Sequence, residues 1–180
     1  MRIRDILAQH KRIENLDALN IVATALSTRK EAVLTDLDRD IDEKTCLHIE
    51  DLFSKREKGV PLAYIAKNKE FFSEQFYVDE AVLIPRPETE VLIEEALELI
   101  AKNKEINNLL DVGTGPGTIG LTLAKKTHKH VACTDISFEA LRVAQRNAKN
   151  LGVEGLTHFV CSNLFSAINN SKFDMILANL

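Results

Sequence analysis

A glycine-rich turn at residues 113–117 points most directly to chemistry. An apolar segment ending in Asp111 precedes the turn, and a helix-like segment, residues 118–126, follows it. The glycines allow positive φ angles or let a ligand press against bare backbone. A doubly wound α/β sheet begins its nucleotide site with the same order of strand, tight turn and helix start. The stretch therefore predicts a nucleotide-type cofactor site.

The acids around this turn bear on which cofactor it would take. Residues 115–120 also match the dinucleotide pattern G-x-G-x-x-G, and Asp135 follows near the spacing at which an acid binds ribose hydroxyls in either class. Asp111, at the strand tip, has little use beside a pyrophosphate. It suits a cationic ligand, and S-adenosylmethionine carries an ammonium and a sulfonium. We therefore favour S-adenosylmethionine, with a dinucleotide or a plain tight turn as alternatives.

A second unusual stretch is residues 83–90, in which Arg86 stands between Pro85 and Pro87. Pro87 suits the first position of a helix, and Glu88 would favour the positive end of its dipole. This accounts for the second proline but not for the arginine. A side chain with its backbone locked on both sides is held as a substrate or cofactor contact requires, so a proline-stiffened helix start and a binding role are both open.

Alternating strands and helices are expected to position these groups. Residues 131–135, 157–161 and 173–178 read as buried strands, and residues 138–151 read as an amphipathic helix closed by Gly152. With the strand before the glycine turn, this gives about four parallel strands.

Polar residues follow each of these strands. Asp111, Asp135, the pair Ser162 and Asn163, and Asn179 all stand at or just past strand ends. Because ligands bind beyond the carboxyl ends of parallel strands, we expect these groups to share one edge of the sheet.

The N-terminal third reads as a small helical bundle. Apolar residues recur at helical spacing, residues 28–31 form a capping box, and Asp42 can cap a further helix. An aromatic and β-branched stretch, residues 70–78, suggests a hairpin. We expect a helical domain over 1–59, a hairpin linker over 60–86, and the α/β module over 87–180.

Composition narrows the class of protein. The 180 residues are 45% hydrophobic with net charge −4, and no basic stripe of the kind that binds duplexes appears, which disfavours a nucleic-acid partner. No apolar run is long enough to span a membrane. Three widely spaced cysteines favour reduced thiols and a cytoplasmic protein. His128 and His130 lack a nearby third ligand, so no metal site is expected.

The motifs together resemble one family, the glutamine methyltransferases of peptide chain release factors, often called the HemK family. The resemblance covers essentially the whole chain. Residues 83–90 look like the family's interdomain hallmark, residues 111–117 like its cofactor loop, and residues 134–148 like its second strand and following helix. It implies a helical substrate-recognition domain, a hairpin linker and a Rossmann-like catalytic domain, and it implies release factors as protein substrates of a monomeric enzyme.

The resemblance also implies roles for individual residues. It assigns catalysis to Asn179, and substrate binding to Asn179, Arg86 and Glu88. The cofactor S-adenosylmethionine would be bound by Asp111, Gly113, Thr114, Gly115, Pro116, Gly117, Asp135, Asn163, Leu164 and Asn179. The family usually has an acid where this chain has Asn163, and often a larger aromatic at the Leu164 position.

The implied reaction methylates the side-chain amide nitrogen of the glutamine in a Gly-Gly-Gln loop. That nitrogen is a poor nucleophile because its lone pair is delocalised. In the family, an asparagine side chain and a following backbone carbonyl accept both amide hydrogens and aim the nitrogen at the methyl group, and such positioning can be worth roughly 7–11 kcal/mol. Asn179 takes the asparagine's place. In the family a proline follows this asparagine directly, whereas this chain has Leu180 at that position and ends there. We therefore expect the chain to be truncated.

Three other functions remain open at this point. A close relative would methylate a glutamine of a ribosomal protein. An adenine methyltransferase acting on nucleic acid uses a similar asparagine motif, although the nine acidic and three basic side chains of residues 61–100 oppose it. A truncated chain that binds a cofactor without catalysis is the third.

Overall fold

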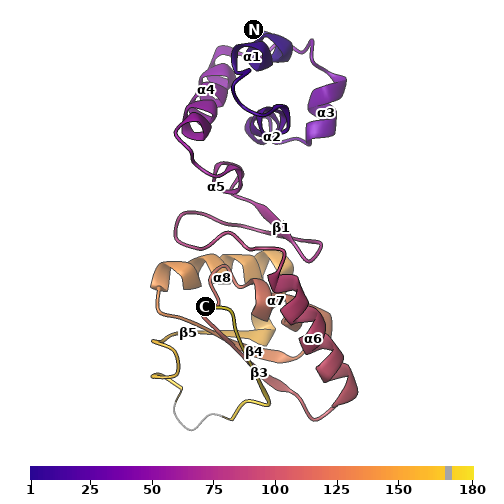
Figure 1. Cartoon of the computed structure of the whole chain (residues 1–180), viewed down its shortest axis with the longest axis vertical. Helices are drawn as coiled ribbons and strands as arrows, with labels where there is room; N and C mark the ends of the chain where they lie inside the picture. The colour runs from indigo at the N-terminus through magenta and orange to yellow at the C-terminus, as the bar shows by residue number, and fades with distance from the viewer. Residues whose placement is uncertain (169–171) are drawn as a thin grey trace. The chain divides into compact units, whose positions relative to one another are not determined.

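The computed structural model describes residues 1–168 and 172–180. They form two compact units, residues 1–67 and 68–180, whose helices α1–α8 and strands β1, β3, β4 and β5 are labelled in Figure 1. The boundary between the two units therefore falls inside the linker expected over residues 60–86, because the hairpin belongs to the second unit.

The first unit is helical. Its helices are α1 (Ile3–Gln9), α2 (Asn15–Ala25), α3 (Lys30–Thr35), α4 (Glu43–Glu57) and α5 (Leu62–Ala66). Their apolar faces meet in one core that includes Ile6, Ile21 and Phe53, all fully buried. Burial of such side chains, each worth about 1.5–3 kcal/mol, holds the bundle together.

The helix starts in this unit test two capping expectations. The prediction for Asp42 is confirmed: its Oδ1 accepts a hydrogen bond from the backbone N–H of Thr45 at 3.0 Å, at the start of α4. The capping box at residues 28–31 is wrong. Arg29, rather than Thr28, immediately precedes α3, and no side chain caps that helix. Thr28 lies one residue too early for its hydroxyl to serve as the cap.

The hairpin consists of β1 (Lys69–Phe71) and β2 (Glu74–Phe76), which pair antiparallel. Its turn residues, Phe72 and Ser73, both have positive φ angles, as two-residue hairpin loops with the twist of the strands require. Phe71 and Phe76 are buried with their rings edge to face, their centroids 6.1 Å apart. Because both rings belong to the core of the second unit, the hairpin is built into that unit.

A parallel sheet organises the second unit. Its strands are β3 (Asn108–Val112), β4 (His130–Asp135), β5 (Thr157–Cys161) and β6 (Met175–Ala178), in the order β5-β4-β3-β6. Consecutive strands β3, β4 and β5 step outward one after another, and β6 then returns to the other side of β3. The reversal between β3 and β6 is a topological switch point, where open α/β sheets bind ligands. The predicted α/β class with about four parallel strands is confirmed.

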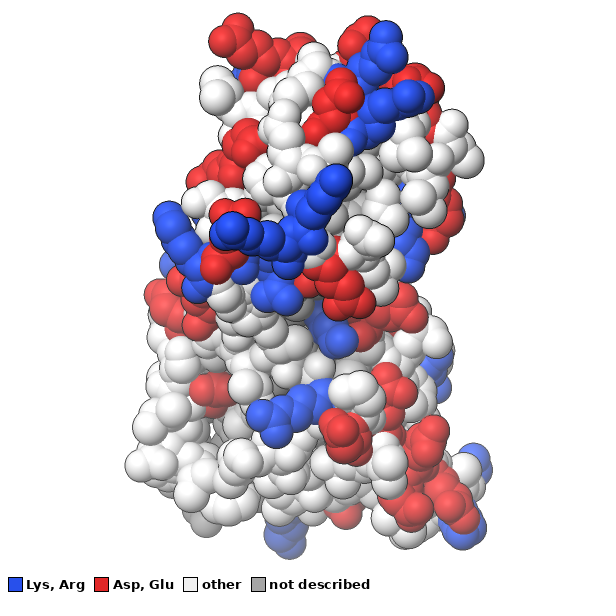
Figure 2. Space-filling view, turned by 45° about the horizontal axis from the view of Figure 1, so that its top comes forward, with Lys and Arg blue, Asp and Glu red and all other residues white. Residues whose placement is uncertain are grey.

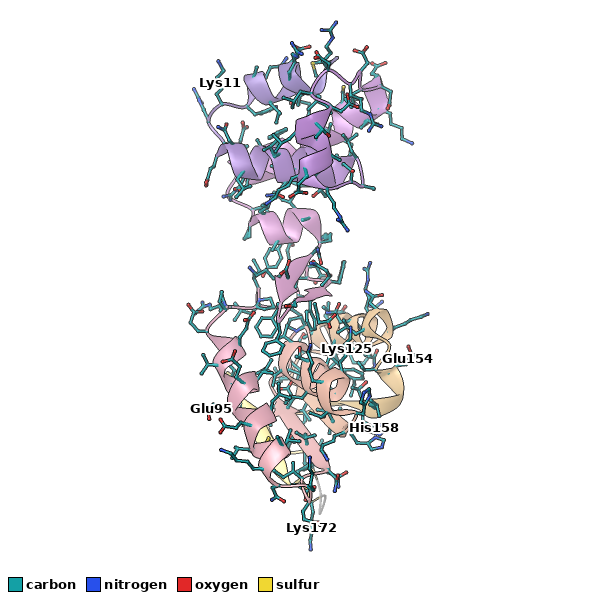
Figure 3. All side chains as sticks on the ribbon, turned by 90° about the vertical axis from the view of Figure 1, so that its right-hand side faces the viewer. Lys11, Glu95, Lys125, Glu154, His158 and Lys172 are labelled. Atoms are coloured by element: carbon teal, nitrogen blue, oxygen red, sulfur yellow. The ribbon has the colours of Figure 1, made fainter. Side chains whose placement is uncertain are left out.

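Helices α7 (Thr118–Thr127) and α8 (Phe138–Leu151) pack on this sheet, and α6 (Thr89–Lys102) packs against α7. A short 3₁₀ helix, η1 (Glu154–Leu156), leads from α8 into β5. Buried side chains of all three helices share one core with the strands, while Glu95 on α6 projects away from the sheet (Figure 3). The helix α6 starts later than expected. Arg86 and Pro87 accept turn hydrogen bonds from Thr89 and Glu90, so Pro87 lies before the first helical residue.

The surface carries both signs of charge. On the face drawn in Figure 2, Lys and Arg side chains are interleaved with Asp and Glu side chains. Among the described residues, none of the helices combines the length and apolar character needed to cross a membrane.

Candidate functional site

The strand-end residues singled out in the sequence meet at one edge of the sheet. The register places Asp111 of β3 beside Cys133 of β4 and Leu177 of β6. Asp135 ends β4 directly beside Cys161, the last residue of β5. Since the strands are parallel, the residues that follow each of them emerge on the same side.

The glycine-rich turn runs along this edge. Gly113 and Gly115 have φ angles of 69° and 53°, a region that side chains rarely adopt. A Cβ on Gly113 would lie 2.5 Å from a methyl carbon of Leu180, whereas the space beside Gly115 is open. The backbone at Gly115 is therefore accessible to a ligand.

Asp111 lies beneath the turn. Its side chain is fully buried, and its Oδ2 accepts hydrogen bonds from the Thr114 hydroxyl at 2.6 Å and from the N–H of Gly120, in the first turn of α7, at 2.9 Å. Burial raises the pKa of the Asp111 carboxyl from its ordinary value of 3.8 to about 6, against the lowering effect of those two hydrogen bonds. Its Oδ1 is buried with no hydrogen-bond partner. The carboxylate thus holds the turn from below and contributes negative charge there.

Asp135 lies beside the turn and is half-buried. Its Oδ2 accepts from the N–H of Gly115, and its Oδ1 from the N–H of Ser137, both at 2.9 Å. Its backbone carbonyl accepts from the N–H of Ser162 at 2.9 Å. One residue therefore ties the glycine turn to the loop after β5.

The loop after β5 carries the next predicted residues. The Ser162 hydroxyl donates to the carbonyl of Leu164 at 2.9 Å and accepts from the N–H of Ala167 at 3.1 Å. Asn163 and Leu164 are exposed, and so is Ile136, next to Asp135, with 71% of its surface accessible. Ile136 was not singled out in the sequence, although an isoleucine immediately after a strand-end acid is the signal that could have marked it.

A cavity of about 260 Å³ opens at the same edge. It brings together the glycine turn, the segment before α6 and the end of β6. Its lining residues are Leu83, Ile84, Pro85, Arg86, Thr89, Gly113, Thr114, Gly115, Pro116, Thr118, Ile119, Asn179 and Leu180. Of the other predicted site residues, Asp111, Gly117, Asp135, Asn163, Leu164 and Glu88 lie outside this lining.

Asn179 enters the cavity from the end of β6. Its Nδ2 donates a hydrogen bond to the Thr89 hydroxyl at 2.8 Å. Its Oδ1 has no partner among the described residues, so the amide is oriented with a free acceptor. Thr89 was missed in the sequence, because ninety residues separate it from its partner.

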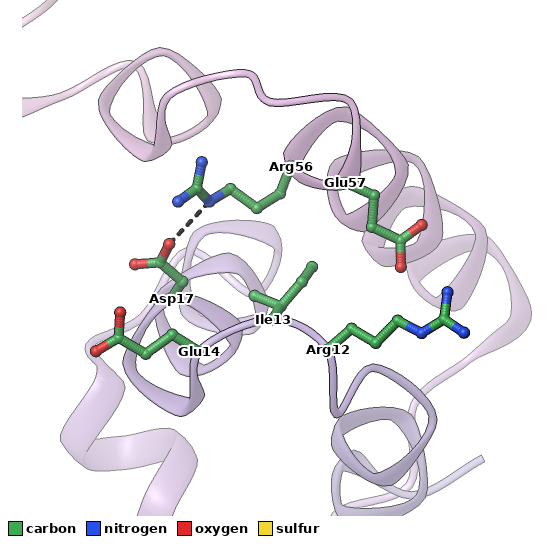
Figure 4. Close-up of a pocket in the computed structure, with 6 residues that line it drawn as sticks. All are labelled: Arg12, Ile13, Glu14, Asp17, Arg56 and Glu57. Atoms are coloured by element: carbon green, nitrogen blue, oxygen red, sulfur yellow. Dashed lines mark hydrogen bonds and ion pairs between the residues drawn. The ribbon is translucent and has the colours of Figure 1, made fainter.

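A second cavity, of about 440 Å³, lies within the first unit. Figure 4 shows its lining side chains around the loop between α1 and α2 and the end of α4. The Arg56 Nε donates to Asp17 at 2.8 Å, whereas Arg12 is free of ion pairs with described residues. Nowhere in residues 1–168 and 172–180 do three or more potential metal ligands cluster.

A parallel sheet with a switch point beside β3, a glycine turn after β3 and a carboxylate near the end of each of β3 and β4 defines a Rossmann-like module. Comparison with known proteins narrows this class. Residues 88–179 match the family model described as methyltransferase small domain, and residues 1–66 match the PrmC N-terminal domain. The chain therefore belongs to the methyltransferase small domain family.

Relatives of the chain carry one recurring name. A release factor glutamine methyltransferase of Borreliella burgdorferi is 35% identical over 99% of this chain, and one of Koribacter versatilis is 40% identical over 91%. These matches confirm the resemblance expected from the motifs. The chain spans 63% and 58% of the lengths of these two relatives.

A solved structure supports the fold alone. The S-adenosylmethionine-dependent methyltransferase of Agrobacterium tumefaciens matches with a TM-score of 0.51 and 20% identity, over 62% of this chain and 38% of that one.

Proposed function

We propose that the protein methylates the side-chain amide nitrogen of the glutamine in the Gly-Gly-Gln motif of peptide chain release factors, using S-adenosylmethionine. The observation that carries the proposal is the cavity at the switch point. Asn179, whose Oδ1 has no partner among the described residues, and the glycine turn both line this cavity, which supports the proposal. A substrate amide and a cofactor bound there would be neighbours.

The residues of the edge fit S-adenosylmethionine. The open space at Gly115 admits a ligand against backbone, and Asp111 and Asp135 make the region anionic, which suits a ligand with an ammonium and a sulfonium. When bound, this cofactor supplies an electrophilic methyl group. Asp135, next to Gly115, would accept from the ribose hydroxyls with the lone pairs that its bonds to Gly115 and Ser137 leave. The exposed side chains of Ile136 and Leu164 offer apolar surface for an adenine ring.

Asn179 would hold the substrate. The bond from its Nδ2 to Thr89 fixes the plane of the amide, so its Oδ1 can accept one hydrogen of the glutamine amide. With one hydrogen bonded to Asn179, the glutamine nitrogen would be aimed at the methyl group. The second hydrogen of the glutamine amide would remain available to a backbone carbonyl. Positioning, rather than proton abstraction, is what these groups provide.

The segment before α6 would hold the substrate main chain. Arg86 lines the cavity and makes no ion pair with a described residue, so its guanidinium is free to donate to peptide carbonyls. Glu88 is exposed at the start of α6, outside the cavity lining. Its proposed contact is therefore with a part of the release factor beyond the glutamine.

The first unit would recognise the release factor away from the reacting residue. Its cavity is lined by Arg12, which forms no ion pair with a described residue and lies on the Glu57 side, and by the paired Arg56 and Asp17 on the other side (Figure 4). A free charge at the rim of a cavity contributes mainly to encounter and register with a partner.

Methyl transfer tests the proposal directly. The enzyme is this chain extended at its C-terminus with the remaining segment of the Borreliella burgdorferi relative, incubated with methyl-labelled S-adenosylmethionine and a release factor. Label should enter the factor and should be absent from a factor whose Gly-Gly-Gln glutamine is replaced by glutamate, which has no amide nitrogen. The same extended chain carrying Asn179→Ala is the enzyme control. Failure to label the unaltered factor, or preferential labelling of a ribosomal protein in competition, would contradict the proposal.

A further inference from the structure

Asn147, on α8, is a fully buried polar side chain in an otherwise apolar helix face. Its Oδ1 accepts a hydrogen bond from the N–H of Tyr77 at 2.7 Å. Its Nδ2 donates to the carbonyl of Tyr77 at 2.9 Å and to the carbonyl of Pro116 at 2.8 Å. Both amide hydrogens and the amide oxygen are thus used, and each partner is a backbone group.

This pattern is specific to a carboxamide. An apolar residue of the same size would leave a backbone N–H and two carbonyls without this partner, at about 1–3 kcal/mol for each buried group. A carboxylate could accept from Tyr77 but would set its second oxygen against two carbonyls. No other side chain of this shape both donates twice and accepts once.

The two segments that Asn147 joins both lead to residues that line the cavity. Pro116 belongs to the glycine turn and lines the cavity itself. Tyr77 begins the segment that continues to Leu83 and Arg86, which also line the cavity. The Tyr77 end is reinforced, because the Arg146 guanidinium lies 3.5 Å above the Tyr77 ring and the Tyr77 hydroxyl donates to Asp79 at 3.0 Å.

We propose that Asn147 is a positioning residue, which ties the glycine turn to the segment of residues 77–86 and so holds the turn in the shape that the cofactor needs. The identity of that cofactor rests on the proposed function, whereas the coupling of the two segments does not. Asn147 would act through Pro116, without touching cofactor or substrate.

Asn147→Asp is the informative variant, because it preserves shape and the bond from the Tyr77 N–H. Binding of S-adenosylhomocysteine to the chain, measured by calorimetry at pH 8, should weaken about tenfold or more. Below the pKa of the new carboxyl, its O–H donates again. The affinity of Asn147→Asp, divided by that of the unaltered chain at the same pH, should therefore be at least threefold higher at pH 5.5 than at pH 8. Gln145→Glu adds the same charge at an exposed site of α8 and should bind within twofold of the unaltered chain at both pH values.

Hydrogen exchange supplies a readout that needs no ligand. In Asn147→Asp, amides of residues 74–80 and 113–119 should exchange at least tenfold faster than in Gln145→Glu, while amides of β4 and β5 keep their protection. If the unaltered chain fails to bind S-adenosylhomocysteine while Asn147→Asp shows this exchange pattern, the proposed cofactor is contradicted and the coupling of the two segments is supported. Unchanged exchange in both segments, or a uniform loss of protection with unaltered affinity, would overturn the role of Asn147.

Discussion

The hydroxyl of Thr114 donates to the carboxylate of Asp111 at 2.6 Å, and this bond separates a buried charge from the cavity that Thr114 lines. The acid at the strand tip therefore faces the turn rather than the open space. Its contribution to a cationic ligand would be its field, acting at short range through material of low dielectric. The same burial makes the site costly for the fold.

Asp111→Asn should expose that cost as a pH dependence. The folded pKa of Asp111, about 6, lies above its ordinary value of 3.8, so the folded state binds the proton more tightly and loses stability as pH rises from about 4 to 6. The asparagine variant lacks this loss, and its Oδ1 can accept both bonds that Asp111 Oδ2 accepts. Its free energy of unfolding relative to the unaltered chain should rise by about 3 kcal/mol over that window and stay level above it. Urea denaturation at a series of pH values measures this, and a flat difference would contradict it.

Thr89→Val should separate orientation of Asn179 from its presence. Valine has the shape of threonine but cannot accept from the Asn179 Nδ2. In the extended enzyme, kcat for methyl transfer should fall about tenfold with little change in KM, because the amide is still there but no longer held. Asn179→Ala should lower kcat by about 10²–10³-fold. Equal losses in the two variants would argue that Thr89 has another role.

Phe76→Ala should unfold the second unit more readily than it disturbs the first. The ring is fully buried at the hairpin, so its loss should cost about 3–5 kcal/mol of unfolding free energy. Phe72, at the turn and half-buried, is the matched control and should cost much less when changed to alanine. Equal costs would mean that the hairpin is peripheral to the core.

Arg12→Glu should weaken capture of the release factor. In the extended enzyme, KM for the factor should rise severalfold, more at low salt than at high salt, because a screened charge is being reversed. Lys44→Glu is the control, because it reverses a charge at the start of α4, whereas the end of α4 lines the cavity. If both variants leave KM unchanged, the cavity of the first unit does not face the partner.

Local sequence patterns predicted several of the helices and strands closely. Helix α8 and strand β5 begin and end at the expected residues. The reason is local: Ser137 caps α8, with its hydroxyl accepting from the N–H of Ala140, and Gly152 ends the helix with a positive φ. Where such signals were weak, as at Thr28 or Pro87, the boundary shifted by one or two residues.

The contacts that shape the site were beyond reach of local patterns. The position of Asp111 before the glycine turn predicted that it lies at the end of a strand. The same position is compatible with an acid that faces a ligand and with an acid that holds the turn, so the sequence could not distinguish the two. The pairs Thr89 with Asn179 and Tyr77 with Asn147 join residues ninety and seventy positions apart. Their bonds depend on the packing of α8 against the sheet and of α6 against α7.

Calorimetry of this chain with S-adenosylmethionine, S-adenosylhomocysteine and NAD tests the central claim most directly. We expect the two adenosyl ligands to bind at least tenfold more tightly than NAD, with the cationic S-adenosylmethionine losing more affinity than its neutral-sulfur analogue in Asp111→Asn. Tighter binding of NAD, or an equal loss for both adenosyl ligands in that variant, would contradict a site built around a positively charged methyl donor.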